Sequence, residues 1–451
     1  MTGVFSAKRA LTAQPARTGP LSRRRLLRGV AATSAGGLLG SLTGCDRRSI
    51  PKDRQLSELW FSYGGKNRQV LEALVKRFNQ EQSKIWVRAI FQGDYFENLA
   101  KLRTAAAAKA VPAMSHVVGE VIPYLAAANV LEPLDAYPGS QALGLVKALG
   151  QAGSWVGGGK KPLVALPFNR STPIAYLNGD WLRESKVKPP TTWQGLLETA
   201  QIFTQRRGDR TLRWGFECPI DWWFWAALVG QAGGQIIEPD GEISLGGDAG
   251  VKAIELWQGL VTRERVMKPP PGRDYSAWEA TNQDFLAGRV GMIWTSTAFL
   301  KYLEQNAAFP VVAAPLPGEA RRAVPTGGTF FVVMREAPPE QKQAAWEFLR
   351  WMMAPKQTIE WATSTGYMPV AQAAVEQLEA SGYYEQHPND RVALDQLEVA
   401  FQWPWSRELF RIQREIVQPR LEQTVLTGTD ARQAMDAARA LAKGELAGGG
   451  R

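Results

Sequence analysis

Apolar and polar positions alternate along the first third of the chain in a pattern that predicts strands and helices in turn. Short apolar runs are typical of buried strands, and the segments between them carry apolar residues at helical spacing or are rich in alanine. Such alternation predicts a sheet with helices on both faces, whose strand-end loops share one rim. The predicted elements are 56–61, 68–82, 85–91, 95–110, 114–118 and 122–129, strand and helix in turn.

The stretch from Leu166 to Tyr176 is predicted to connect two such sheets. An apolar run at 162–166 predicts a short buried strand, which Pro167 ends because proline does not fit a central strand. Four polar residues, 169–172, precede a second apolar run. We therefore expect the chain to leave one sheet, cross an exposed polar gap and enter another.

The rest of the chain predicts a second α/β region, a return to the first region and a helical C-terminal part. Helices are expected at 178–185, 192–206, 248–262, 278–285 and 339–354, strands at 214–218, 290–295, 309–315 and 327–334, and a third crossing at 361–367. The predicted domains are 1–44 as a signal peptide, 45–54 as a tether, 55–167 with 316–366 as an N-terminal lobe, and 168–315 with 367–445 as a C-terminal lobe.

The N-terminal segment has the features of an export signal. Paired arginines in 22–28 precede an apolar stretch, 29–42, that is too short to span a bilayer as a helix. The arginines resemble a twin-arginine signal, although an ordinary secretion signal also carries basic residues. The sequence Leu42-Thr-Gly-Cys45 resembles a bacterial lipobox. We expect Cys45 to be lipidated, which tethers the protein outside the plasma membrane.

Charge and composition exclude several classes. The net charge is +10, and residues 1–44 contribute +7 of it, which leaves +3 and no case for a nucleic-acid binder. Two histidines are too few for a histidine-built metal site. Motifs for a serine hydrolase, a zinc protease or a phosphate-binding loop are missing from the sequence. Lipidation of Cys45 would leave Cys218 unpaired. A Cys45–Cys218 disulfide is the alternative.

Several short motifs together resemble the extracellular solute-binding proteins of ABC importers. Within the carbohydrate-type family 1, the resemblance is strongest to the glycerol-3-phosphate-binding proteins and covers about 55–445. It implies an α/β, two-lobe periplasmic-binding-protein fold, each lobe a mixed sheet flanked by helices, with several hinge crossings. The motifs are 93–99, Leu166-Pro-Phe-Asn-Arg-Ser-Thr-Pro173, Trp222-x-x-Trp225, Gly327-Gly328, Gly366-Tyr-Met-Pro369 and 421–438.

The resemblance also implies a set of ligand contacts. Two features depart from the family pattern: the phosphate-binding arginine matches Ser406 unless the alignment shifts by one residue to Arg407, and Arg170 stands where relatives carry a small hydroxyl residue. Arg170 and Thr297 are additional candidates. The implied contacts are Tyr95, Glu120, Ser171, Trp222, Trp225, Ser296, Gly328, Tyr367 and Arg407.

These residue types suit a polar solute. Two tryptophans three residues apart share a helix face and can stack on a sugar or cover a quaternary ammonium group. Hydroxyls, glycine N–H groups and an arginine can bind phosphate. Each residue has a plainer alternative: the tryptophans and Tyr367 as core residues, and Glu120 and Arg407 as solvated surface charges.

The sequence thus predicts a binding protein that has no cofactor and catalyses no reaction. It would capture a small polar solute outside the cytoplasm and deliver it to the transmembrane subunits of an ABC permease. Glycerol-3-phosphate or a glycerophosphodiester is the favoured ligand, and a neutral oligosaccharide such as a maltose- or trehalose-like sugar is the alternative. A secreted hydrolase is the remaining possibility from another class.

Overall fold

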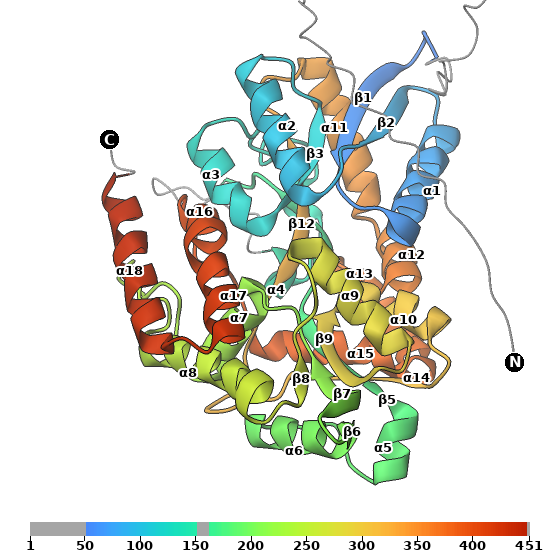
Figure 1. Ribbon diagram of the computed structural model, residues 1–451. Coiled ribbons are helices and arrows are strands. Elements are labelled where there is room, and N and C mark those ends of the chain that lie inside the picture. The colour runs from blue at the N-terminus through green and yellow to red at the C-terminus, as the bar shows by residue number, and fades with distance from the viewer. Residues whose placement is uncertain (1–50, 151–161, 449–451) are drawn as a thin grey trace, which may run out of the picture. The chain divides into compact units, whose positions relative to one another are not determined.

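Five strands from distant parts of the sequence form the first sheet (Figure 1). The computed structural model describes residues 51–150 and 162–448. The strand order is β2-β1-β3-β12-β4; β1 is parallel to β2 and β3, and β12 is antiparallel to β3 and β4. The strands are β1 Gln55–Phe61, β2 Ile85–Phe91, β3 Met114–Val118, β4 Leu166–Ser171 and β12 Gly327–Val333.

Strand β12 shows why this sheet carries helices on both faces. Phe331 and Val333 belong to one hydrophobic cluster, whereas Phe330 and Val332 belong to another. Successive side chains of a strand point to opposite faces, so both faces of the sheet are buried. The predicted mixed α/β sheet is confirmed. The helices of these segments are α1 Gly65–Glu81, α2 Tyr95–Ala107, α3 Ile122–Ala127, α4 Lys147–Gly150, α11 Pro339–Met352 and α12 Pro355–Thr365.

The second sheet follows the order β10-β5-β9-β7-β6, and β8 pairs with β7. A hairpin at its edge was not predicted, because residues 205–213 are rich in arginine and largely exposed, without hydrophobic alternation. The strands are β5 Pro173–Asn178, β6 Gln205–Arg207, β7 Arg210–Glu217, β8 Met267–Lys268, β9 Val290–Ser296 and β10 Val311–Ala314. The helices are α5 Gly179–Ser185, α6 Trp193–Phe203, α7 Trp222–Gln231, α8 Gly247–Gln258, α9 Asp274–Leu286 and α10 Leu300–Asn306.

The connection between the sheets differs from the prediction. Strand β4 begins at Leu166 and includes Pro167, which is possible because β4 is the edge strand of its sheet. Only Thr172 separates β4 from β5, and it is 0% exposed. The expected exposed gap is therefore wrong: the polar residues complete an edge strand and are buried. Gln396 holds the crossing, since its Nε2 donates to Thr172 Oγ1 at 2.9 Å and to the Pro173 carbonyl at 2.7 Å.

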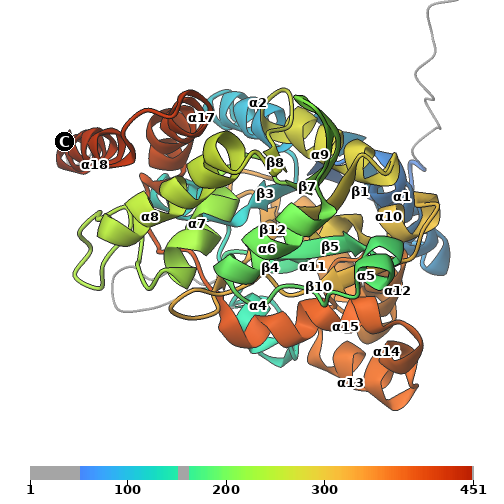
Figure 2. The ribbon, with the colours of Figure 1, turned by 60° about the horizontal axis from the view of Figure 1, so that its bottom comes forward.

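The chain turns near the end of the range predicted for the third crossing, 361–367. Helix α12 runs through Trp361 to Thr365, and the chain turns at Gly366, whose φ is +99°. The C-terminal part is helical apart from β13, which pairs with β11. Figure 2 shows α13, α14 and α15 grouped on one side and α17 and α18 on another. These elements are β11 Val324–Pro325, α13 Gln372–Ala380, α14 Tyr383–Gln386, α15 Pro388–Asp395, β13 Ala400–Phe401, α16 Leu409–Arg411, α17 Gln418–Thr427 and α18 Ala431–Gly448.

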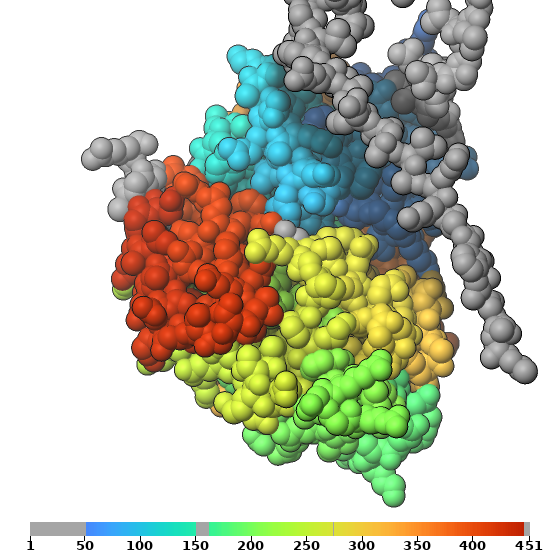
Figure 3. Space-filling model, in the orientation of Figure 1, coloured from blue at the N-terminus to red at the C-terminus, as the bar shows by residue number. Residues whose placement is uncertain are grey.

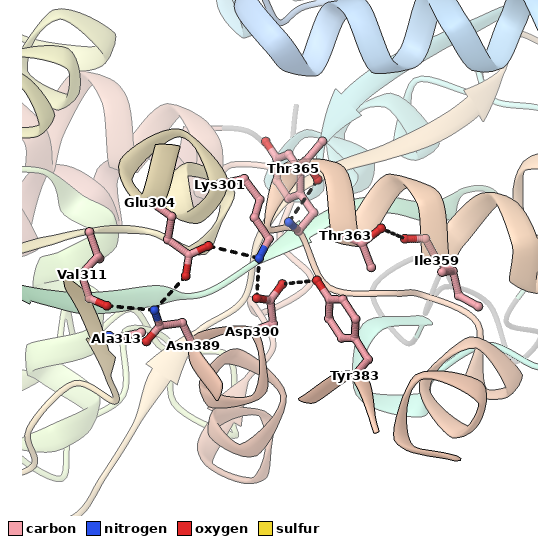
Figure 4. A network of polar contacts seen from close by, with 11 residues as sticks. Lys301, Glu304, Val311, Ala313, Ile359, Thr363, Thr365, Tyr383, Asn389 and Asp390 are labelled. Atoms are coloured by element: carbon pink, nitrogen blue, oxygen red, sulfur yellow. Dashed lines mark hydrogen bonds and ion pairs between the residues drawn. The ribbon is translucent and has the colours of Figure 1, made fainter. Parts of the chain in front are cut away.

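A buried polar network joins α10 to α15 (Figure 4). Lys301 Nζ lies 2.5 Å from Asp390 Oδ2 and 3.2 Å from Glu304 Oε2, and Tyr383 donates to Asp390 at 3.2 Å. Asn389 donates to Glu304 at 2.8 Å and to the carbonyl of β10 residue Val311 at 2.9 Å. Because the paired charges are hardly exposed, this network fixes the helices that follow Gly366 against the second sheet.

Contacts divide the chain into two units, 1–49 and 50–451, and every described residue belongs to the second. The predicted lipidation site, Cys45, lies outside the described residues. Cys218 is a free, fully buried cysteine, and burial raises the pKa of its thiol well above the ordinary value. In the part of the chain that the structure describes, no helix is both long enough and apolar enough to cross a membrane.

Candidate functional site

The site is built where β4 and β12 pair, because two glycines let the chain approach closely there. Gly328 has φ +89°, and a Cβ at this position would lie 1.7 Å from the Asn169 carbonyl oxygen. A Cβ on Gly327 would lie 2.5 Å from Cζ2 of Trp223. The ladder changes register between Gly328 and Phe330, which is a bulge beside the polar end of β4.

Asn169 organises the hydrogen bonds of this end. Its Oδ1 accepts from the backbone N–H of Thr329 at 2.7 Å and from the Thr329 hydroxyl, and its Nδ2 donates to the Tyr367 hydroxyl at 3.3 Å. Tyr95 shares side-chain hydrogen bonds with Asn169 and Tyr367. Burial raises the pKa of both tyrosines, so their hydroxyls stay protonated and can donate.

Three parallel strands deliver residues to the same rim, as the sequence predicted. Tyr63 follows β1, Tyr95 opens α2 after β2, and Glu120 follows β3. Tyr63 and Glu120 each interact electrostatically with Tyr95. Tyr95 is held by a capping box: Asp94 accepts from the N–H groups of Phe96 and Glu97 at 2.8 Å, and Glu97 accepts from the Asp94 N–H at 3.1 Å.

Arg170 is the buried cation of the site. It is 1% exposed, its Nη1 donates to the Gly328 carbonyl at 3.2 Å, and its guanidinium lies 4.3 Å from the ring centroid of Phe330. Within the described residues its Nε has no hydrogen-bond partner. Burial lowers the pKa of Arg170 to about 10, and the charge of Glu120 acts in the opposite direction. The side chain is charged at neutral pH and held in place.

Two carboxyl groups accompany this cation. Glu120 is 6% exposed, and burial raises its pKa to about 7; its own backbone N–H and Arg170 oppose the shift, and Asp221 adds to it. Asp221 is the N-cap of α7 and accepts from the Trp223 N–H at 2.8 Å. We refer to six residues that are linked by pairwise interactions as the polar cluster: Tyr95, Glu120, Asn169, Arg170, Asp221 and Tyr367.

The tryptophans of α7 divide between site and core. Trp222 is partly exposed, and its ring centroid lies 4.6 Å from that of Trp403. Trp225 is 1% exposed, and its indole N–H donates to the Gly250 carbonyl at 3.2 Å, which is the geometry of a core residue. Trp223 lies directly against Gly327. The helix therefore presents Trp222 and Trp223, rather than Trp225, near β12.

The predicted hydroxyl residues lie close to the crossing. Ser171 pairs with Gly327 in the sheet, and Ser296 caps a short turn by accepting from the Ala298 N–H at 3.2 Å. The backbone N–H of Thr297 donates to the Thr172 carbonyl at 3.2 Å. The Thr297 side chain is 1% exposed, and its hydroxyl has no hydrogen-bond partner in the part of the chain that the structure describes. These groups sit at the junction of the two sheets.

Arg407 occupies a different environment from Arg170. Its side chain is 47% exposed, and Nε lies 2.6 Å from Oε1 of Glu408. This geometry is that of a surface ion pair. Arg407, which stands near the phosphate-binding position of the family pattern, is therefore not a buried cation. Arg170 supplies the buried cation instead.

Several residues near the site were not singled out from the sequence. Asn169 stands inside the predicted crossing motif, and Tyr63 stands in one of the predicted rim loops, so both had a signal in the pattern. Tyr275 begins α9 as a single aromatic among polar residues and had none. Its hydroxyl interacts electrostatically with Tyr95 and Tyr367.

Of two hollows in the described part of the chain, one is lined in part by Tyr367 of the cluster, and the other by none of the cluster residues. One of about 10 Å³ is lined by Tyr367, Tyr383 and Asp390 and is large enough for one water molecule. A groove of about 290 Å³ lies between α2 and α3, with Arg103 and Tyr124 in its wall. Among the described residues no group of acidic, histidine or cysteine side chains is arranged to hold a metal ion.

Comparison with known proteins identifies a family and several relatives of this chain. The family described as bacterial extracellular solute-binding protein matches residues 73–389. The sn-glycerol-3-phosphate-binding periplasmic protein UgpB of Pectobacterium atrosepticum is 23% identical over 75% of this chain and 78% of that protein. UgpB of Salmonella typhimurium is 25% identical over 75% and 79%.

Solved structures show the same fold. UgpB of Mycobacterium tuberculosis in complex with glycerophosphocholine superposes with a TM-score of 0.76, at 23% identity over 86% of this chain and 98% of that one. The substrate-binding protein Lmo0181 of Listeria monocytogenes in complex with cycloalternan gives 0.77, at 18% identity over 88% and 100%. The predicted two-lobe fold is confirmed. The chain belongs to the bacterial extracellular solute-binding proteins, and it is an extracytoplasmic binding protein rather than an enzyme.

Proposed function

We propose that this protein captures a glycerophosphodiester and delivers it to an ABC permease. In this proposal the ligand lies on the polar cluster, between a lobe formed by 55–167 with 316–366 and a lobe formed by 168–315 with 367–445. The lobes close by rotating about the crossings near Thr172 and Gly366. The permease then accepts the closed, loaded form.

The observation that carries the choice of ligand is the charge of the polar cluster. Arg170 interacts electrostatically with Glu120, and Asp221 is a second carboxyl group that interacts with Glu120. A phosphomonoester brings nearly two negative charges, which one shared guanidinium offsets poorly. A phosphodiester brings one negative charge, and a cationic head group at its other end would favour the surplus carboxylate. A zwitterionic diester therefore matches this site better than glycerol-3-phosphate.

Relatives support the same chemistry. The UgpB proteins of Pectobacterium and Salmonella are named for glycerol-3-phosphate, and the Mycobacterium tuberculosis structure holds glycerophosphocholine. Trp222 and Trp403 add an aromatic surface close to the Thr326 carbonyl, to which the Trp403 indole N–H donates at 2.9 Å. Such a surface suits an onium group or the apolar face of a polyol.

A neutral oligosaccharide is the second candidate. The protonated hydroxyls of Tyr95 and Tyr367 and the amide of Asn169 are the donors and acceptors that sugar hydroxyls need. Structural neighbours at low identity include proteins bound to cycloalternan and maltose. A neutral sugar carries no charge, so it gives no reason for the buried ionisable side chains of Arg170 and Glu120.

Calorimetric titration tests the proposal. The purified protein is titrated with sn-glycero-3-phosphocholine, sn-glycerol-3-phosphate and maltotriose under one buffer condition. We expect the tightest binding for the diester, weaker binding for the monoester and no heat for maltotriose. Tight maltotriose binding with no response to either glycerol phosphate would overturn the choice of ligand and leave the binding-protein class intact.

The proposed tether is tested separately. If Cys45 is lipidated, the wild-type protein in the native host takes up a labelled fatty acid and sediments with membranes, whereas Cys45→Ala does neither. Replacing Arg23 and Arg24 by lysine distinguishes the export routes, because a twin-arginine signal depends on this pair. Unlabelled wild-type protein would contradict the lipoprotein assignment.

A further inference from the structure

The first turn of α9 presents an aromatic side chain that the packing of the protein does not use. Tyr275 is 57% exposed, although its side chain is a large aromatic ring. Burying such a ring stabilises a structure, so an exposed one next to a binding site is a candidate for contact with a ligand.

The orientation of α9 directs this ring toward the site. One turn further along, Trp278 packs against Trp223 and Phe224, with centroid distances of 5.5 Å and 4.9 Å. Trp223 in turn lies against Gly327, beside the bulge of β12. Residues three apart share a helix face, so Tyr275 continues the Trp278 face outward from the site.

The helix is anchored at both ends, which fixes the position of this ring. Arg273 Nε lies 2.6 Å from Oε2 of Glu422 on α17, and Asp284 near the other end pairs with Lys268 and Arg289. On the face drawn in Figure 3, the yellow surface of α9 borders the blue surface of the first-sheet helices and the red surface of the C-terminal helices. Tyr275 interacts electrostatically with Tyr95, the first residue of α2, and with Tyr367, so it lies near the polar cluster while remaining exposed.

We propose that Tyr275 is a specificity-determining residue, whose ring packs on the part of the ligand that extends beyond the glycerol phosphate. This inference rests on the proposed function. The inner polar cluster would hold the glycerol phosphate, and Tyr275 would cover the head group as a cation–aromatic contact. A ligand without that group would end before reaching α9.

Titration of Tyr275→Ala and Tyr275→Phe tests this assignment. We expect Tyr275→Ala to bind sn-glycero-3-phosphocholine about five- to thirtyfold more weakly, because an aromatic face under an onium group is lost. Its affinity for sn-glycerol-3-phosphate should change by less than about twofold. Tyr275→Phe keeps the ring and should bind both ligands like the wild type.

Tyr124→Ala is the matched control. Tyr124 is a partly exposed tyrosine on α3, next to Arg103 and apart from the polar cluster, so its loss should affect neither ligand. Thermal unfolding of all variants checks that the fold is retained. Unchanged binding of the diester to Tyr275→Ala, or an equal loss for diester and monoester, would overturn the inference.

Failure of the inference can be separated from failure of the proposed ligand. If the wild type binds the diester and Tyr275→Ala binds it equally well, only the role of Tyr275 is wrong. If the wild type binds maltotriose and no glycerol phosphate, the ligand class is wrong. Tyr275→Ala is then titrated with maltose and maltotriose. A loss of affinity for maltotriose alone still supports a contact between Tyr275 and the outer end of the ligand.

Discussion

The two sides of the site differ in how their residues are held. On the first-sheet side, Asn169 and Arg170 are bound to the backbone around Gly328 and have little freedom. On the second-sheet side, Trp223, Trp278 and Tyr275 are held by ring packing or left exposed. Hydrogen bonds fix direction, whereas ring contacts tolerate displacement. The first side should decide the charge of the ligand, and the second its length.

Removing Arg170, on the first-sheet side, should cause the largest change in ligand affinity. Arg170→Met leaves Glu120 without its buried cation, so we expect at least about a hundredfold weaker binding of the diester and a loss of roughly 3 kcal/mol in unfolding free energy. Calorimetry and denaturant unfolding measure the two effects. Arg213→Met is the control, because Arg213 also covers a ring, 4.0 Å from Trp181, away from the polar cluster. Equal binding by both variants would contradict the role of Arg170.

The glycine bulge supports the first side, and its loss should be the next largest effect. Gly328→Ala forces a Cβ against the Asn169 carbonyl, so we expect destabilisation by about 3 kcal/mol and impaired binding. Gly241 has the same φ of +89° and nothing within 4 Å of an added Cβ. Gly241→Ala should therefore cost only about 1 kcal/mol, which separates backbone strain from the clash. Similar unfolding midpoints for the two variants would show that the clash is relieved.

Protonation of Glu120 should make the stability of the first side depend on pH. Its pKa rises from an ordinary value of 4.5 to about 7, mainly through burial, with Arg170, Asp221 and Tyr95 as its charged or titratable neighbours. Between these values the folded protein holds a proton that the unfolded chain has released. The stabilisation is present below pH 4.5 and is lost as the pH rises through 7, by about 3 kcal/mol.

Glu120→Gln should flatten this part of the pH–stability curve. Glu217, which is 0% exposed and whose pKa burial raises to about 7, contributes with the same sign. Glu217→Gln is therefore the matched control for the ligand: both variants should flatten the curve, but only Glu120→Gln should weaken diester binding above pH 7. Unfolding curves at several pH values, with and without ligand, measure both. A curve as steep in Glu120→Gln as in the wild type would be inconsistent with a raised pKa at Glu120.

Arg407→Ala should have the smallest effect. Its exposed ion pair with Glu408 is the kind that contributes between 0 and about 1 kcal/mol. We expect less than about a twofold change in diester affinity, measured beside Arg170→Met. A loss comparable to that of Arg170→Met would mean that the segment around Arg407 moves into the site when the ligand binds.

Hydrophobic patterning predicted the frame of the protein but not all of the site. Strands β2 and β3 fall on the predicted residues because their apolar runs are short and clearly bounded. Strand β4 was misplaced because Pro167 excludes a central strand, and the sequence does not show that β4 lies at an edge. The spacing of Trp222 and Trp225 identified a helix face, but which tryptophan contacts Gly327 depends on tertiary packing. Tyr275 could not be found because its neighbours along the chain carry no motif.

The buried thiol of Cys218 has a practical consequence. The thiol is fully buried and its pKa is raised well above the ordinary value, so thiol reagents should not react with it while the protein stays folded. A single cysteine placed on the exposed start of α9 would then be the preferred target for a fluorescent label within the folded part of the chain. Such a labelled protein could report solute concentration directly, as a reagentless optical sensor.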